Sequence, residues 1–179
     1  MADIRVPNSD RCFRILRQTP AALRDLLALA TRETLDWRPS SERWSIGMVL
    51  AHLAEVEIAG FRSRFEAMLA AMPGADPPLL PSYDQLALFR SQTQFDPYAE
   101  LTRFEEERNE TMALLQEMPD GAGQRSGRHA ELGIINVAQL LNEFAFHDLG
   151  HIRQIVELYR AHVFYPEMGV YQGYYKIHP

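Results

Sequence analysis

Two histidines near the end of the chain, His147 and His151, lie four residues apart in a segment with helical periodicity. At this spacing two side chains share one face of an α-helix, one turn apart, so both imidazoles can reach a single point. A third histidine, His52, occurs beside Val49 and Val56 in an earlier segment with the same periodicity. Three neutral imidazoles from two packed helices would form a divalent-metal site with open coordination positions. The sequence therefore predicts that His52, His147 and His151 are metal ligands.

The same three histidines also have a simpler interpretation. Each borders an apolar stripe, which is typical of a hydrogen-bonded histidine at the rim of a helical core. The chain contains six histidines, so one pair at this spacing can arise by chance. From spacing alone, a bundle that holds no metal remains open.

Four other titratable residues are candidates for a supporting role. Glu55 and Glu143 each lie one helical turn from a predicted ligand, where a carboxylate can orient an imidazole or act as a general base. Both positions are equally typical of solvent-exposed helix carboxylates. Asp148 is predicted to face the bundle interior, where it needs a partner, and a structural role or a role in orienting a ligand is expected over a catalytic one. His129 precedes the last helix and either overhangs the site or caps that helix at the surface.

The apolar periodicity predicts four long helices that can position these groups. Thr19-Pro20 is a typical helix start, Ser45 can cap the second helix, and Asp96-Pro97 repeats the first signal. Residues 8–18 form a lead-in turn or short helix. The helices are predicted at about 19–36, 46–72, 97–118 and 134–162.

The remaining segments are predicted to be connections. Prolines prevent helix formation in much of residues 73–95, which we expect to form a long crossover with one short helix around 84–92. Residues 119–133 are predicted to be a loop, and no alternating strand pattern of useful length occurs. The fold class is therefore all-α, a four-helix bundle with a long crossover between helices 2 and 3, which is a common setting for metal sites.

Composition limits the remaining possibilities. The 179 residues are expected to form one domain, residues 1–179, with a core at about 10–162 and an aromatic C-terminal tail at 163–179. The formal charge of −6 argues against a nucleic-acid partner. No stretch has the length and apolarity of a signal peptide or a membrane span, so we expect a cytoplasmic protein without membrane contact.

Two stretches of the sequence resemble a known family. Residues 44–57, which contain His52, are similar to the second-helix signature of the DinB/YfiT-like superfamily. Residues 127–133 and 147–154 resemble its fourth-helix region. The resemblance extends from about residue 10 to residue 162, in order and with plausible spacing.

The resemblance implies a four-helix bundle, often dimeric, with a divalent metal that is commonly nickel or zinc. It places three histidine ligands at His52, His147 and His151. Some members use a low-molecular-weight thiol as transferases or isomerases, and others are described as metal-dependent hydrolases. The resemblance thus implies a homodimer and a divalent-metal cofactor, with a low-molecular-weight thiol as a second possible cofactor.

Two classes of function follow from the predicted site. In the first, the protein is a metal-dependent enzyme that activates water or a thiol for attack on a small electrophile, as a hydrolase or a thiol S-transferase. This hypothesis predicts a pocket over the histidines and a small-molecule substrate. In the alternative, the protein is a non-catalytic metal-binding or scaffold bundle, and the space above the histidines is shallow or filled.

Overall fold

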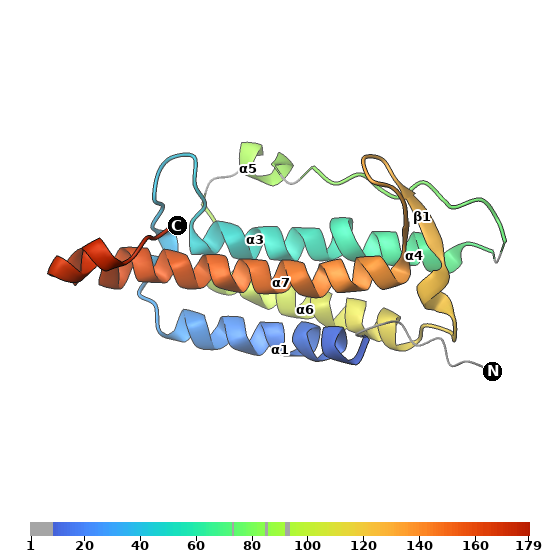
Figure 1. Cartoon of the computed structure of the whole chain (residues 1–179), viewed down its shortest axis with the longest axis horizontal. Coiled ribbons are helices and arrows are strands. Elements are labelled where there is room, and N and C mark those ends of the chain that lie inside the picture. The colour runs from blue at the N-terminus through green and yellow to red at the C-terminus, as the bar shows by residue number, and fades with distance from the viewer. Residues whose placement is uncertain (1–8, 73, 85, 92–93) are drawn as a thin grey trace.

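Four long helical rods dominate the computed structural model, which describes residues 9–72, 74–84, 86–91 and 94–179 (Figure 1). The second rod is composite, because a π-helical segment joins two α-helices. Helices α1 and α3 each pack against both α6 and α7. This arrangement confirms the predicted four-helix bundle. The rods are α1 (Ser9–Ala28), α3 (Ile46–Val56) with η1 (Glu57–Arg62) and α4 (Ser63–Ala70), α6 (Pro97–Gln116), and α7 (Val137–Tyr159).

The long crossover follows from the direction of the helices. The rod α3–α4 and helix α6 run in the same direction, so the segment between them must return along the bundle (Figure 1). This segment contains the short helix α5 (Ala87–Ser91), close to the short helix predicted around 84–92. The crossover begins at the hairpin end of the bundle and returns past α3 to the end where α6 begins (Figure 1).

The prediction that residues 119–133 form a loop is wrong in part. An antiparallel hairpin forms from β1 (Ser126–His129) and β2 (Gly133–Asn136). Its first strand also pairs with the crossover: Leu80 N–H donates to Arg128 O at 2.9 Å, and Arg128 N–H donates to Pro78 O at 2.7 Å. These partners are distant in sequence, so a local pattern could not reveal them.

The last helix begins at Val137, three residues later than predicted. Asn136 caps it in a reciprocal capping box, with the Asn136 side chain accepting from Gln139 N–H and Gln139 accepting from Asn136 N–H. This cap satisfies two backbone donors at the helix start, and it favours a start after Asn136 over one within the hairpin.

The predicted helix start at Thr19-Pro20 is also wrong. Helix α1 begins at Ser9 and passes through Pro20 without ending. Because proline has no N–H, the carbonyl of Leu16 loses its ordinary helical donor. The Arg108 guanidinium replaces it, donating from Nη1 to Leu16 O at 2.8 Å. The predicted first helix also ends early: α1 stops at Ala28. A separate helix, α2 (Arg32–Asp36), follows, with Thr31 as its N-cap.

The π-helical segment η1 corrects the register of the second rod. The apolar positions Val56 and Phe61 are five residues apart, one more than an α-helical face allows. In η1, Ser63 N–H donates to Ile58 O, five residues back, which absorbs the extra residue. Phe61 and Phe65 therefore both reach the core, at 2% and 0% exposure.

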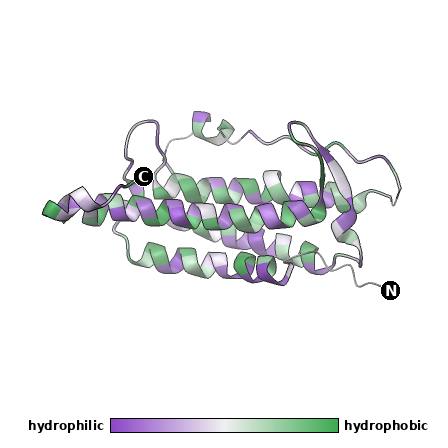
Figure 2. Cartoon of the chain, viewed as in Figure 1, coloured by the Kyte–Doolittle hydropathy of each residue, from purple (hydrophilic) through white to green (hydrophobic). Residues whose placement is uncertain are grey.

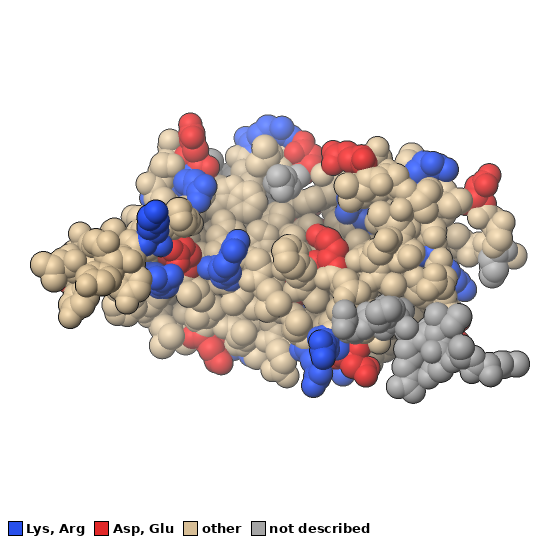
Figure 3. Space-filling model, viewed as in Figure 1, with Lys and Arg blue, Asp and Glu red and all other residues tan. Residues whose placement is uncertain are grey.

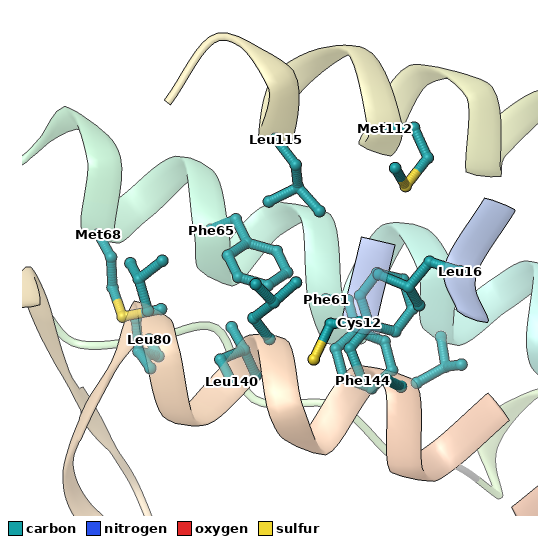
Figure 4. Packing of buried hydrophobic residues seen from close by; sticks show 14 residues of the cluster. Cys12, Leu16, Phe61, Phe65, Met68, Leu80, Met112, Leu115, Leu140 and Phe144 are labelled. Atoms are coloured by element: carbon teal, nitrogen blue, oxygen red, sulfur yellow. The ribbon is translucent and has the colours of Figure 1, made fainter. Parts of the chain in front are cut away.

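Two apolar clusters fill opposite halves of the bundle. Figure 4 shows the cluster at the hairpin half, where Phe61, Phe65 and Phe144 lie among aliphatic and sulfur-containing side chains. The other cluster contains Leu23, Leu53 and others from the same rods. Between them lies a layer of buried polar side chains, which includes His52, Glu57, Arg108 and Asp148.

No helix among the described residues has both the length and the apolarity needed to cross a membrane. The extent of the single domain and the implied homodimer stay predictions.

The close approach of Gly127 to the crossover gives a test of the fold. A Cβ at this position would lie 2.3 Å from Leu80 Cδ2 and 2.9 Å from Met68 Cγ. Gly127→Ala is therefore expected to lower the free energy of unfolding by about 1–3 kcal/mol, measured by chemical denaturation. In the control Gly173→Ala the new Cβ meets nothing within 4 Å, and we expect a change below about 0.5 kcal/mol. Equal midpoints for both variants would contradict this packing.

Candidate metal centre

The structure brings the three predicted ligands together. His52 extends from α3, and His147 and His151 extend from α7, so that one ligand atom of each lies within 4.8 Å of the others. The Nε2 atom of His147 is 3.3 Å from Nε2 of His52 and 3.2 Å from Nε2 of His151. Two nitrogens bound at zinc-like distances in tetrahedral geometry are about 3.3 Å apart. The two distances from His147 therefore fit ligands of a single divalent ion, and the full set of three lies within 4.8 Å.

Two hydrogen bonds orient the outer nitrogens of the rings. His151 Nδ1 lies 2.9 Å from Gln154 Oε1, and because an amide oxygen only accepts, Nδ1 carries the proton. His52 Nδ1 lies 3.3 Å from the hydroxyl of Tyr83, which reaches the site from the crossover. In His151 this proton leaves the lone pair on Nε2, which lies 3.2 Å from Nε2 of His147. This is the tautomer that a metal ligand requires.

His147 differs from the other two histidines. Its Nδ1 is buried and has no hydrogen-bond partner among the described residues. A buried polar atom without a partner costs free energy. The favourable interaction of this ring must therefore come from its other nitrogen, which points at His52 and His151.

Burial keeps the rings uncharged. It lowers the pKa of His52 to about 3 and that of His147 to about 2, with the neighbouring imidazoles acting in the same direction. Burial also lowers the pKa of His151, while its bond to Gln154 opposes the change. All three rings are thus in the neutral form that binds metal at pH 7.

Aromatic side chains form the walls of the site. The Trp44 ring lies 5.0 Å from the His52 ring and stacks on His151 at 6.4 Å with an interplanar angle of 8°. Phe61 meets His147 edge-on at 5.2 Å. These contacts restrict ring rotation and keep water from the inner side of the cluster.

A buried ion cluster lies beside the histidines. Arg108 of α6 donates to Glu57 from Nε at 3.0 Å and from Nη2 at 2.9 Å. It donates to Asp148 from Nη1 at 2.7 Å and from Nη2 at 2.9 Å. With the bond to Leu16 O, all five N–H donors of the guanidinium have acceptors.

The faces of the guanidinium are covered as completely as its edges. Its central carbon lies 4.7 Å from the centroid of the Phe104 ring and 4.6 Å from that of Phe144. The side chains of Arg108 and Asp148 are 2% and 0% exposed. Asp148 thus lies in the interior, as the helical pattern predicts, and it has a structural role in joining α7 to α6.

The sequence interpretation did not identify Arg108 as a partner of Asp148. A signal was available, because Arg108 falls between Phe104 and Met112 at the four-residue spacing of an apolar stripe. A charged residue at such a position requires a buried counter-ion.

The other candidates occupy different places. Glu55 pairs with Arg103 at the partly exposed α3–α6 boundary. His129 lies in β1, where its Nδ1 accepts from the N–H groups of Glu131 and Leu132 in the hairpin turn; it does not reach the three histidines. Of these candidates, only Glu143 shares a groove with His147 and His151.

The groove is a hollow of about 700 Å³ along the outer face of α7. The predicted pocket over the three histidines is present in part, because His147 and His151 line this groove and His52 does not. Figure 2 shows that hydrophobic and hydrophilic residues alternate along this face, and Figure 3 shows several basic side chains over the C-terminal half of α7. The groove is lined by Arg43, Glu143, Phe146, His147, Gly150, His151, Arg153, Gln154, Glu157, Arg160, His178 and Pro179.

Comparisons with known proteins give the family of the chain and a solved structure with a similar fold. A sequence model of the DinB superfamily matches residues 15–155. The YfiT protein of Bacillus subtilis (strain 168) is 26% identical over 154 residues, which cover 84% of each chain. A solved structure of YfiT, described as a probable metal-dependent hydrolase with an unusual four-helix bundle topology, matches with a TM-score of 0.76 at 25% identity. That match covers 90% of this chain and 91% of the other.

The ion cluster yields a prediction with a matched control on the same helix. Arg108→Met leaves two carboxylates buried without a counter-ion, so we expect the free energy of unfolding to fall by about 3–5 kcal/mol. Arg103→Met removes the partly exposed pair with Glu55, and we expect a loss below about 1 kcal/mol. Urea denaturation at pH 7 measures both. Similar losses in the two variants would contradict the assigned role of Arg108.

Proposed function

The chain belongs to the DinB superfamily, and from this premise we propose that it is a metal-dependent hydrolase whose zinc or nickel ion is held by His52, His147 and His151. The observation that carries the proposal is the convergence of three Nε2 atoms, 3.2 and 3.3 Å apart, beside an open groove. Three imidazoles suit both metals. The description of YfiT as a probable metal-dependent hydrolase supports the same class of reaction.

The groove favours an enzyme over a purely structural metal site. A structural zinc site is closed by four protein ligands, whereas a catalytic site keeps a position for water or substrate. Only three potential ligands cluster among the described residues, and two of them line the groove. The non-catalytic alternative predicts a shallow or filled space above the histidines, whereas a groove of about 700 Å³ lies beside two of them.

The ion would supply Lewis acidity, which makes water a stronger acid near neutral pH. The chain supplies orientation: Tyr83 and Gln154 fix the outer nitrogens of His52 and His151. Trp44 and Phe61 close the inner side, so substrate approaches from the groove.

We assign the proton-transfer role to Glu143. It lines the groove one helical turn before His147 and stays exposed there, and partial burial raises the pKa of its carboxyl, although Arg64 opposes this shift. In ester or amide hydrolysis, the water oxygen bonds to the acyl carbon and the bond from that carbon to the leaving group breaks. Glu143 accepts the proton lost by water and returns it to the leaving oxygen or nitrogen.

Removal of one imidazole tests the metal site. His147→Ala is expected to lower the bound zinc or nickel from about one equivalent to near zero, measured by elemental analysis, and to abolish ester hydrolysis. Circular dichroism should show the helical content retained. His162→Ala is the control, because His162 stacks on Trp37 outside the cluster and should keep metal and activity. Full activity in His147→Ala would refute the proposal.

Glu143→Gln tests the proton-transfer role separately. The variant should keep its metal, because Glu143 is not one of the three converging ligands. Its kcat should fall by about 10²–10⁴-fold with little change in KM. Glu55→Gln provides the control, since Glu55 pairs with Arg103 away from the groove. An unchanged kcat in Glu143→Gln would exclude this carboxylate as the proton acceptor.

A further inference from the structure

We propose that the groove binds an elongated ester or amide with an anionic end, that Arg153 binds this anion, and that Gly150 keeps the space above α7 open for it. The inference rests on the proposed function and names its substrate class: small acyl compounds that carry a carboxylate or phosphate group. Three features of the outer face of α7 carry it.

The first feature is a glycine that packing does not require. Gly150 lies inside α7, between His147 and His151, where glycine costs roughly 1 kcal/mol relative to alanine. Glycines in tight contacts have neighbours that a Cβ would strike, as Gly127 does, but a Cβ at Gly150 would meet nothing within 4 Å. Gly150 lines the groove. A side chain there would fill the space beside the histidines, so its absence serves access to them.

The second feature is the alignment of three groove residues. Phe146, Gly150 and Arg153 follow the four- and three-residue spacing of one helical face and span about 10 Å along the axis. Phe146 is 78% exposed, an unusual place for a large aromatic ring on a helix. A ligand lying over Gly150 would have an apolar surface at one end and a guanidinium at the other.

The third feature is an uncompensated positive charge. Arg160 lies 2.5 Å from Glu157, whose other oxygen accepts from His178 N–H at 3.1 Å. Arg43 donates to the backbone oxygen of Pro179. In contrast, Arg153 forms no hydrogen bond or ion pair with any residue that the structure describes. A free guanidinium in a groove matches a carboxylate or a phosphate by two parallel hydrogen bonds.

The positions of these residues relative to the histidines set the orientation of the ligand. Arg153 lies on the C-terminal side of His151, whereas Glu143, the assigned proton acceptor, precedes His147. The anionic end is therefore held away from Glu143, and the scissile bond lies near His147 and His151.

A binding measurement tests this inference without using the reaction. The full-length chain, both with zinc and after dialysis against EDTA, is titrated with hexanoate, hexyl phosphate and neutral hexanamide, and binding is followed by NMR chemical shifts. In the EDTA-treated protein, where no metal can ligate the anion, at least one anion should bind tenfold or more tightly than hexanamide. The tighter anion identifies the group as carboxylate or phosphate.

Variants assign the effect to residues. Arg153→Gln should reduce the preference for the anion to near unity, whereas Arg17→Gln, an exposed arginine on α1 with no side-chain partner among the described residues, should keep it. Gly150→Ala and Gly150→Leu should weaken all probes progressively while the melting temperature stays equal or rises. A preference that survives Arg153→Gln, or undiminished binding in Gly150→Leu, would overturn the inference.

Activity measurements separate this inference from the proposed function. With zinc bound, the 4-nitrophenyl monoester of adipate should be hydrolysed with a kcat/KM at least tenfold above that of 4-nitrophenyl hexanoate, which lacks the terminal carboxylate. Anion binding without hydrolysis of either ester would support the groove assignment and contradict the hydrolase. Hydrolysis with no preference between the esters would support the hydrolase and contradict the groove assignment.

Discussion

The contact on which the rest of the structure depends is the buried hydrogen-bonded ion cluster of Arg108, Glu57 and Asp148. One guanidinium joins the α6, η1 and α7 rods, and its bond to Leu16 O adds α1. Charged groups are costly to bury unless every donor and acceptor is satisfied. Here all five donors are used and both faces of the guanidinium are covered by aromatic rings. Such a cluster tolerates only one relative placement of the four rods.

That placement also fixes the histidines. Glu57 follows His52 by five residues in one rod, and Asp148 directly follows His147 in another. A shift of either rod along its axis would break the ion cluster and separate the imidazoles together.

The parts of the structure that follow from local sequence could be predicted, and those that depend on distant partners could not. Helical periodicity predicted four rods and placed His52, His147 and His151 at the edges of apolar stripes. The predicted helix start at Thr19-Pro20 was wrong because the helix continues through Pro20. The donor that Pro20 lacks is replaced by Arg108, a residue 88 positions further along the chain. The hairpin was missed because β1 gains its partners from β2 and from the crossover. Tyr83 has no local signature, since only the return path of the crossover places its hydroxyl near His52.

The side chains of α7 that stabilise the bundle and those that form the candidate site lie on different faces of the helix. Successive residues of an α-helix are rotated by about 100°. The single step from His147 to Asp148 therefore turns from the edge of the groove into the core, where Asp148 is fully buried. One turn later, Gly150 lines the groove, and His151 lies both in the groove lining and beside the other two histidines. The outer face, which contributes least to packing, can thus change its side chains without disturbing the ion cluster. A helix arranged in this way can hold His147 and His151 in place while the side chains of the groove beside them vary.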